Sequence, residues 1–213
     1  MPSRKPSLPL LPKREFRQKR ARITYERLIA SAGRLFAERG FRGTQVPDIA
    51  REAGLSVGAF YRYFEDKREI LIELMHGFLA QQNQLQAAFL DHWREKIVDG
   101  EATGEEFIDA MWEFAVPQYD HHSDLLTTYV ALSYEDERVA ELREAYDEAD
   151  RYDWARFIAA VTTRDRIPSP LAAARTLDLA AEEVLRWSAR KGGRAAADVR
   201  LALRDMLVRY LFR

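Results

Sequence analysis

The chain has 213 residues, 47% hydrophobic and 31% charged, which suffices for one large or two small globular domains and excludes disordered or collagen-like proteins. Cysteine is absent, which excludes disulfide frameworks, thiolate catalysis and cysteine-ligated metal sites. No run of about eighteen apolar residues occurs, and the apolar patch at residues 8–12 is too short and proline-rich for a secretion signal. The sequence therefore predicts a cytoplasmic protein without a membrane span.

Charge is distributed unevenly along the chain. Residues 1–70 contain 16 Lys and Arg against 8 Asp and Glu, whereas residues 71–213 contain 17 against 26. A basic module raises the local concentration of a polyanion, and an acidic remainder keeps that polyanion from spreading over the whole surface. Nucleic acid is the first candidate partner and an anionic membrane the second. Residues 1–20, rich in proline and basic side chains, are expected to form a flexible arm or a solvated tail.

Helical periodicity dominates, and no alternating strand pattern is found, so the predicted fold class is all-α. Thr44, Ser56 and Asp66 are expected to cap the second, third and fourth helices, and Gly54 to end the second. The expected amino-terminal helices are residues 21–39, the segment from Thr44 to Ala53, the segment from Ser56 to about Phe64, and a long helix after Asp66.

Capping residues, glycines and prolines also predict the ends of the later helices. Ser169 and Pro170 predict a helix start, Gly192 and Gly193 a break, and Pro117 a kink or helix end. The expected helices cover about 107–114, 125–132, 135–161, 170–190 and 196–211.

Residues 46–64 have the layout of a helix-turn-helix, two short helices about a turn that contains Gly54. The second helix must present its first turns to a groove about 12 Å wide, and Val57, Gly58 and Ala59 are suitably small. Phe60 and Phe64, four residues apart, are expected to anchor its inner face. Packed helices without a ligand would explain the apolar positions equally well, but not the small residues ahead of Tyr61 and Arg62 in a basic module.

Residues 22–71 strongly resemble the DNA-binding domain of the tetracycline-repressor (TetR) family of bacterial transcriptional regulators. Two departures are Tyr63, where the family usually has His, and Pro47, early in the second helix. The matching positions are Phe36, Gly40, Thr44, Asp48, Ile49, Ala50, Ala53, Gly54, Ser56, Gly58, Tyr61, Phe64, Lys67 and Leu71.

The resemblance implies a helix-turn-helix domain at 21–66 and a helical effector-binding and dimerisation domain at 67–213. It implies a homodimer on a palindromic operator in double-stranded DNA, with phosphate contacts from Thr44, Tyr61, Tyr63 and Lys67. Ser56, Val57 and Ala59 would face base edges, where Val57 and Ala59 offer only methyl groups. Arg62 would reach guanine or a phosphate. Further contacts could come from Arg14, Arg17, Lys19 and Arg20.

The resemblance also implies that helices 170–190 and 196–211 pair with their twofold mates, burial inside the protomer being the alternative. The candidates are Leu177, Ala181, Val184, Leu185, Leu203, Met206, Leu207 and Tyr210. A small, largely apolar or aromatic effector would bind among the middle helices and release a repressor from DNA, although such side chains are more often core. The candidates are Phe107, Met111, Trp112, Phe114, Tyr129, Trp154 and Phe157.

The main alternative is a helical metal-dependent enzyme, because Glu73 and His76 form one Glu-x-x-His pair of the kind found in di-iron bundles. Such bundles need a second copy of that pair, and His92, His121 and His122 do not supply it. No other catalytic motif occurs, so neither a catalytic residue nor a metal or other cofactor is expected. A membrane-surface module would account for the basic arm but not for the helix-turn-helix.

Overall fold

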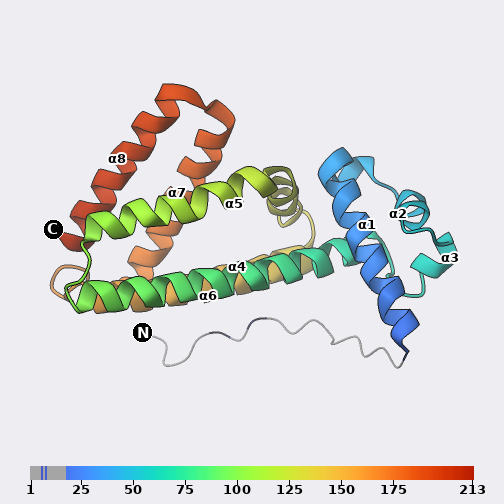
Figure 1. Ribbon diagram of the computed structural model, residues 1–213, viewed down its shortest axis with the longest axis horizontal. Coiled ribbons are helices and arrows are strands. Elements are labelled where there is room, and N and C mark those ends of the chain that lie inside the picture. Colours follow the sequence, from blue (N-terminus) through green and yellow to red (C-terminus); the bar gives the residue numbers. More distant parts are fainter. Residues whose placement is uncertain (1–5, 7, 9–17) are drawn as a thin grey trace. The chain divides into compact units, whose positions relative to one another are not determined.

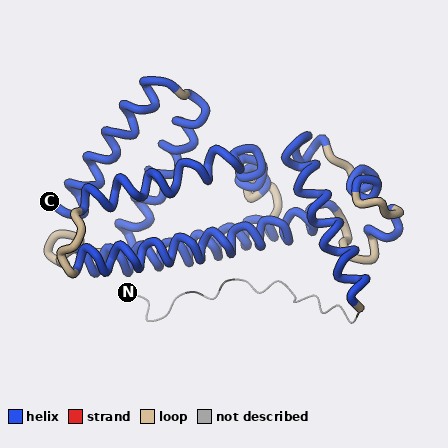
Figure 2. The backbone as a smooth tube through the Cα atoms, in the orientation of Figure 1, coloured by secondary structure: helices blue, strands red, loops and turns tan. Residues whose placement is uncertain are grey.

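The computed structural model describes residues 6, 8 and 18–213, apart from the side chains of 116–124 and 189. All regular structure in this part is helical, as predicted (Figures 1 and 2). None of its helices is long and apolar enough to cross a bilayer. The helices are α1 (Lys19–Gly43), α2 (Val46–Glu52), α3 (Val57–Phe60), α4 (Lys67–Val98), α5 (Gly104–Leu132), α6 (Glu137–Val161), α7 (Pro170–Lys191) and α8 (Gly193–Phe212).

The chain packs as two compact units. The head unit contains Leu8–Gln81 and Asp124–Tyr146, and the body unit contains Met1–Ser7, Gln82–Ser123 and Asp147–Arg213. The head unit thus combines the basic segment with residues 124–146, which follow it only after a long interval of sequence. Because packing units are not functional domains, the functional division at residues 20 and 66 stays a prediction.

The core of the head unit comes from the apolar stripes expected from the sequence. Leu28 and Phe36 of α1, Ile49 of α2 and Phe60 of α3 are buried together with Leu71 of α4. Gly54 adopts a φ of 65° in the turn between α2 and α3, a conformation that L side chains rarely adopt. The helix-turn-helix is therefore held by packing and by one glycine turn.

Aromatic rings fill the core of the body unit. Phe107 of α5 is fully buried and stacks on Phe157 of α6 with ring centroids 4.4 Å apart. At the surface, Arg204 of α8 donates to both carboxylate oxygens of Asp109, at 2.5 and 2.8 Å. The hydrogen bonds from Arg204 hold the pKa of Asp109 below its ordinary value. The contact between the two side chains therefore stabilises the fold at neutral pH, and this stabilisation is lost in acid as Asp109 is protonated.

Three predicted caps are confirmed. Ser56 and Ser169 accept the backbone N–H groups of Ala59 and Ala172, and Asp66 accepts two N–H groups at the start of α4. The cap predicted at Thr44 is wrong, because α2 begins one residue later and Gln45 occupies the cap position.

Two predicted helix boundaries are also wrong. The helices expected at 107–114 and 125–132 are one helix, α5, which continues through Pro117. The third helix ends at Phe60 and not at Phe64, because residues 61–63 form a turn.

Candidate nucleic-acid interface

The start of α3 and the turn after it form an exposed face with four of the predicted DNA contacts. Ser56 and Val57 open this face, and Tyr61 and Arg62 follow it, with Tyr61 57% exposed. Gly58 lies between them and adds no side chain, so a partner surface could approach the backbone there. The face can therefore offer two hydroxyls, one methyl surface and one guanidinium to a polyanion.

Three other predicted contacts lie in different surroundings. Tyr63 is half-buried and packs against the head core. Ala59 is only 4% exposed and faces that core, so its assignment to base edges is corrected. Thr44 is fully buried, with its hydroxyl 2.9 Å from the carbonyl oxygen of Gly40 and 3.1 Å from that of Leu35. Its assignment to phosphate is corrected too, because that hydroxyl fastens the α1–α2 turn from inside.

Gln45 is a candidate DNA contact that the sequence analysis did not identify. It is exposed at the start of α2, and its backbone N–H donates to the carboxylate of Asp48 at 3.2 Å. The adjacent Pro47 is exposed as well. The signal in the sequence was the Gln-x-x-Asp spacing of a helix start, which the expected cap at Thr44 obscured.

Lys67, the first residue of α4, directs its ammonium group inward. Nζ donates to the carbonyl oxygens of Phe41 and Thr44 at 2.8 and 2.9 Å. Burial and, secondarily, the neighbouring Arg68 lower the pKa of Lys67. The ammonium group of Lys67, predicted to contact a phosphate, thus donates to the protein backbone instead.

Among the arm residues, Lys19 and Arg20 begin α1 and are exposed. Arg14 and Arg17 lie outside the described residues. The arm's predicted contribution to DNA binding therefore stays a prediction.

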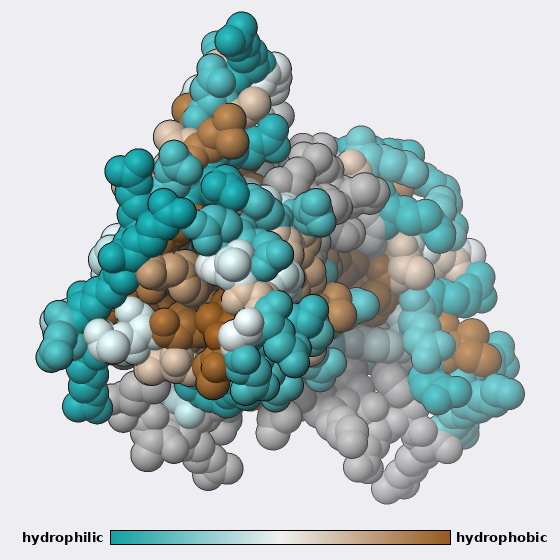
Figure 3. Space-filling model, turned by 60° about the vertical axis from the view of Figure 1, so that its left-hand side comes forward, coloured by the Kyte–Doolittle hydropathy of each residue, from teal (hydrophilic) through white to brown (hydrophobic). Residues whose placement is uncertain are grey.

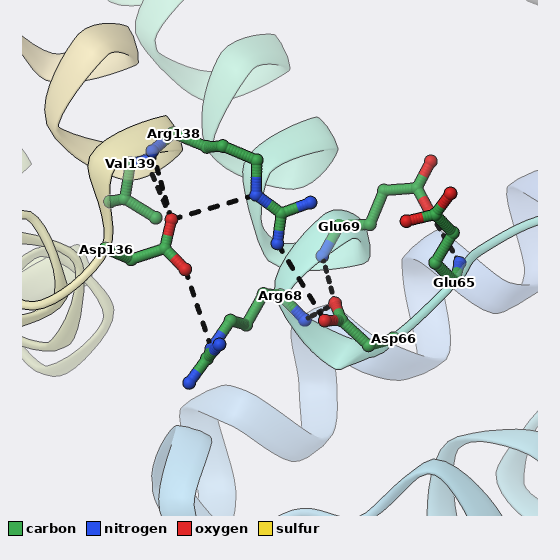
Figure 4. A network of polar contacts seen from close by, with 7 residues as sticks. All are labelled: Glu65, Asp66, Arg68, Glu69, Asp136, Arg138 and Val139. Atoms are coloured by element: carbon green, nitrogen blue, oxygen red, sulfur yellow. Dashed lines mark hydrogen bonds and ion pairs between the residues drawn. The ribbon is translucent and has the colours of Figure 1, made fainter.

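Two aspartates connect the start of α4 with the start of α6 inside the head unit (Figure 4). Asp66 caps α4, and its carboxylate lies 3.8 Å from the guanidinium of Arg138 in α6. Asp136 caps α6 through the N–H groups of Arg138 and Val139, and lies 3.7 Å from the guanidinium of Arg68 in α4. Each cap thus pairs with an arginine near the start of the other helix, which fixes the two starts against each other.

Replacing Asp136 with alanine should lower the free energy of unfolding by about 1 kcal/mol, because a helix cap and two ion pairs are lost together. Replacing it with asparagine should cost only a few tenths of a kcal/mol, since asparagine caps equally well and the arginine partners are about half exposed. Urea unfolding followed by circular dichroism measures both. Equal losses for the two variants would show that capping is not the source of the stability.

The predicted effector residues belong to different units. Phe107, Met111, Trp112, Phe114, Trp154 and Phe157 lie in the body unit, whereas Tyr129 is buried in the head core. Phe107 and Phe157 are almost fully buried and serve the core. Within the described residues, the indole N–H of Trp112 is buried without a hydrogen-bond partner. An unpaired buried donor is costly, and a ligand acceptor could satisfy it.

The predicted dimer residues divide by exposure. Leu185, Leu203 and Leu207 are buried within one protomer, which is the alternative left open by the sequence. Leu177, Ala181 and Val184 are half-buried. Met206 and Tyr210 are exposed by 66% and 45%, so they remain available to a partner. Figure 3 shows patches of hydrophobic residues among hydrophilic ones on the face that it draws.

The metal-enzyme alternative receives no support from the head unit. Glu73 accepts a hydrogen bond from the hydroxyl of Tyr25, and the ring of His76 lies edge-on to Tyr146 with centroids 5.8 Å apart. Within residues 6, 8 and 18–213, leaving out the undescribed side chains, no group of three or more His, Cys, Asp or Glu could hold a metal ion.

Known proteins resemble the chain most clearly over its helix-turn-helix. Residues 28–74 match the profile of a family described as "Bacterial regulatory proteins, tetR family". The HTH-type transcriptional repressor KstR2 of Mycobacterium tuberculosis is 35% identical over 102 residues, which cover 48% of this chain and 47% of that protein. The chain thus matches about half the length of the first curated relatives.

Solved structures resemble it over most of its length. A structure described as a TetR-family transcriptional regulator from Mesorhizobium loti matches with a TM-score of 0.70 and 17% identity, covering 91% of this chain and 98% of that one. The regulator FadR of Bacillus subtilis in complex with stearoyl-CoA matches with a TM-score of 0.55 and 19% identity, covering 86% and 97%. At these identities the likeness shows the fold, a helix-turn-helix with a helical domain. The amino-terminal segment of the chain, residues 28–74, is thus similar to the tetR family of bacterial regulatory proteins.

Proposed function

We propose that the chain is a ligand-responsive transcriptional regulator, more specifically a repressor, that binds a palindromic DNA operator in the cytoplasm. The observation that carries this proposal is the exposed face of Ser56, Val57, Tyr61 and Arg62 on the buried scaffold of the helix-turn-helix. The family profile supports DNA binding, and the name of the M. tuberculosis relative supports repression.

Each of the exposed side chains, and the half-buried Tyr63, has its own role in this proposal. Ser56 and Val57 meet base edges, where Val57 reads the methyl group of thymine by apolar contact. Tyr61 and Tyr63 donate their hydroxyls to phosphates, which set the register on the duplex. Arg62 contacts guanine or a phosphate.

The operator is bound by a homodimer whose contact is the outer stripe of α8. The inner stripe, with Leu203, Leu207 and Leu211, is buried in the protomer, whereas the outer one is exposed and also largely apolar. A helix that is apolar on both sides is normally covered on both. A palindromic operator with half-sites one turn of DNA apart requires two heads about 34 Å apart, which a homodimer supplies. The outer stripe consists of Ala195, Val199, Ala202, Met206 and Tyr210.

The effector is a small, largely apolar or aromatic molecule that binds in the body unit. The unpaired indole N–H of Trp112 supports this, as does the half-buried state of Phe114 and Trp154. Stearoyl-CoA is the first compound to test, because a structural neighbour is described in complex with it. The effector would favour a conformer whose heads no longer match the operator.

The test selects duplexes from a random pool and measures their affinity from 50 to 200 mM salt. A dimer with six to ten phosphate contacts should lose roughly a thousandfold in affinity over that range. Salt-insensitive binding, or none to any duplex at low salt, would contradict the proposal. Binding only to anionic vesicles would favour the membrane-surface alternative.

A further inference from the structure

The turn between α1 and α2 is held by a side chain from outside it. Helix α1 ends at Gly43, and the carbonyl of Phe41 near that end accepts the backbone N–H of Thr44 at 3.4 Å. Lys67 supplies a donor to that carbonyl and a second to the carbonyl of Thr44. Its Nζ also lies 4.5 Å from the ring centre of Phe41, within cation–π range.

The same turn is fastened at two other points. The buried hydroxyl of Thr44 is bonded toward α1, and the carboxylate of Asp48 holds the backbone N–H of Gln45. Lys67 is the contact among these that comes from a distant element, since α4 begins 23 residues after Thr44. Lys67 therefore adds a polar contact between the turn and α4 to the packing of buried Phe41 in the head core.

We propose that Lys67 is a positioning residue for DNA binding, which clamps residues 41–45 so that the exposed start of α2 is presented in a fixed orientation. In this role Lys67 is not a phosphate ligand. The inference rests on the proposed function, because it assigns the effect of Lys67 on DNA to the turn that it holds.

The chemistry of the group supports the clamp. An ammonium has three N–H donors, and two are aligned on carbonyl oxygens at 2.8 and 2.9 Å. Charge-assisted bonds of this kind are stronger than those between neutral groups. Partial burial also lowers the pKa of Lys67, as expected for a cation that gives up hydration for the turn.

The first test is hydrogen exchange in the free full-length chain. The variant Lys67→Met keeps the apolar stem and removes the ammonium, and Arg62→Met removes one exposed charge as the matched control. In Lys67→Met, amides of residues 41–48 should exchange at least about tenfold faster, because the two bonds from Lys67 to the turn are gone. Arg62→Met should leave them unchanged. Unaltered exchange in Lys67→Met would overturn the clamp.

The second test uses the duplex selected with wild-type protein. Lys67→Met should weaken binding while the dependence of log Kd on log salt keeps its wild-type slope. A phosphate ligand would instead lower the slope by about 0.9, and that result would overturn the proposal. If wild-type protein binds no duplex, the proposed function fails, while the exchange experiment still decides the clamp.

A second variant guards against misfolding. Lys67→Gln has no charge but keeps N–H donors on a shorter stem. The clamp predicts exchange at 41–48 intermediate between wild type and Lys67→Met, with an unchanged salt slope. Exchange equal to that of Lys67→Met together with a reduced slope would contradict it.

Discussion

Replacing Phe60 with alanine should lower the free energy of unfolding by about 3–5 kcal/mol and abolish duplex binding. Phe60 is fully buried, and its ring lies 5.6 Å from that of Phe64. Helix α3 has only four residues, too few to be stable in isolation, so its position depends on this packing. Urea unfolding followed by circular dichroism measures the first effect and fluorescence anisotropy the second.

The adjacent Tyr61 provides the control. Tyr61→Phe removes a hydroxyl from a side chain that is 57% exposed, so stability should change by less than about 0.5 kcal/mol. Binding should nevertheless weaken for all duplexes alike, as expected for a lost phosphate contact. A large loss of stability in Tyr61→Phe would contradict its place on the surface, and wild-type binding would remove it from the interface.

Replacing Met206 with glutamate should weaken self-association by about a hundredfold or more. Twofold symmetry puts two new carboxylates into one apolar contact, where unpaired charges are costly. Because Met206 is 66% exposed in the protomer, the protomer should keep its wild-type secondary structure. Sedimentation velocity measures the association, and duplex binding should fall with it because the heads are no longer coupled.

Leu207→Glu is the matched control on the next residue. Leu207 is 4% exposed and belongs to the body core, so this substitution should unfold the body unit. A Met206→Glu protein that remained a stable dimer would place the dimer contact elsewhere on the chain.

Local interactions explain what the sequence predicted correctly. The caps at Ser56, Asp66 and Ser169 bond to N–H groups two or three residues away, so neighbouring residues suffice to specify them. Apolar spacing likewise predicted the all-α class, and the order of small, aromatic and basic residues predicted the helix-turn-helix. None of these features depends on distant parts of the chain.

The start of α2 could not be predicted from neighbouring residues alone, because the predicted cap Thr44 bonds to α1. Thr44 is a favourable cap by residue type. In the structure, however, its hydroxyl donates to the carbonyls of Gly40 and Leu35 in the buried turn. Ala59 similarly lies one position from the exposed Gly58, and helix spacing alone did not show which of them faces the core.

The sequence by itself determined the helical class, most helix starts and the family of the amino-terminal segment. Only the tertiary structure decided that Lys67 bonds to Phe41 and Thr44, and that Asp66 pairs with Arg138 more than seventy residues away. It also decided which stripe of α8 is buried in the protomer and which is left exposed. The physical reason is that periodicity specifies the faces of a helix, whereas the partner of each face is set by packing against distant elements.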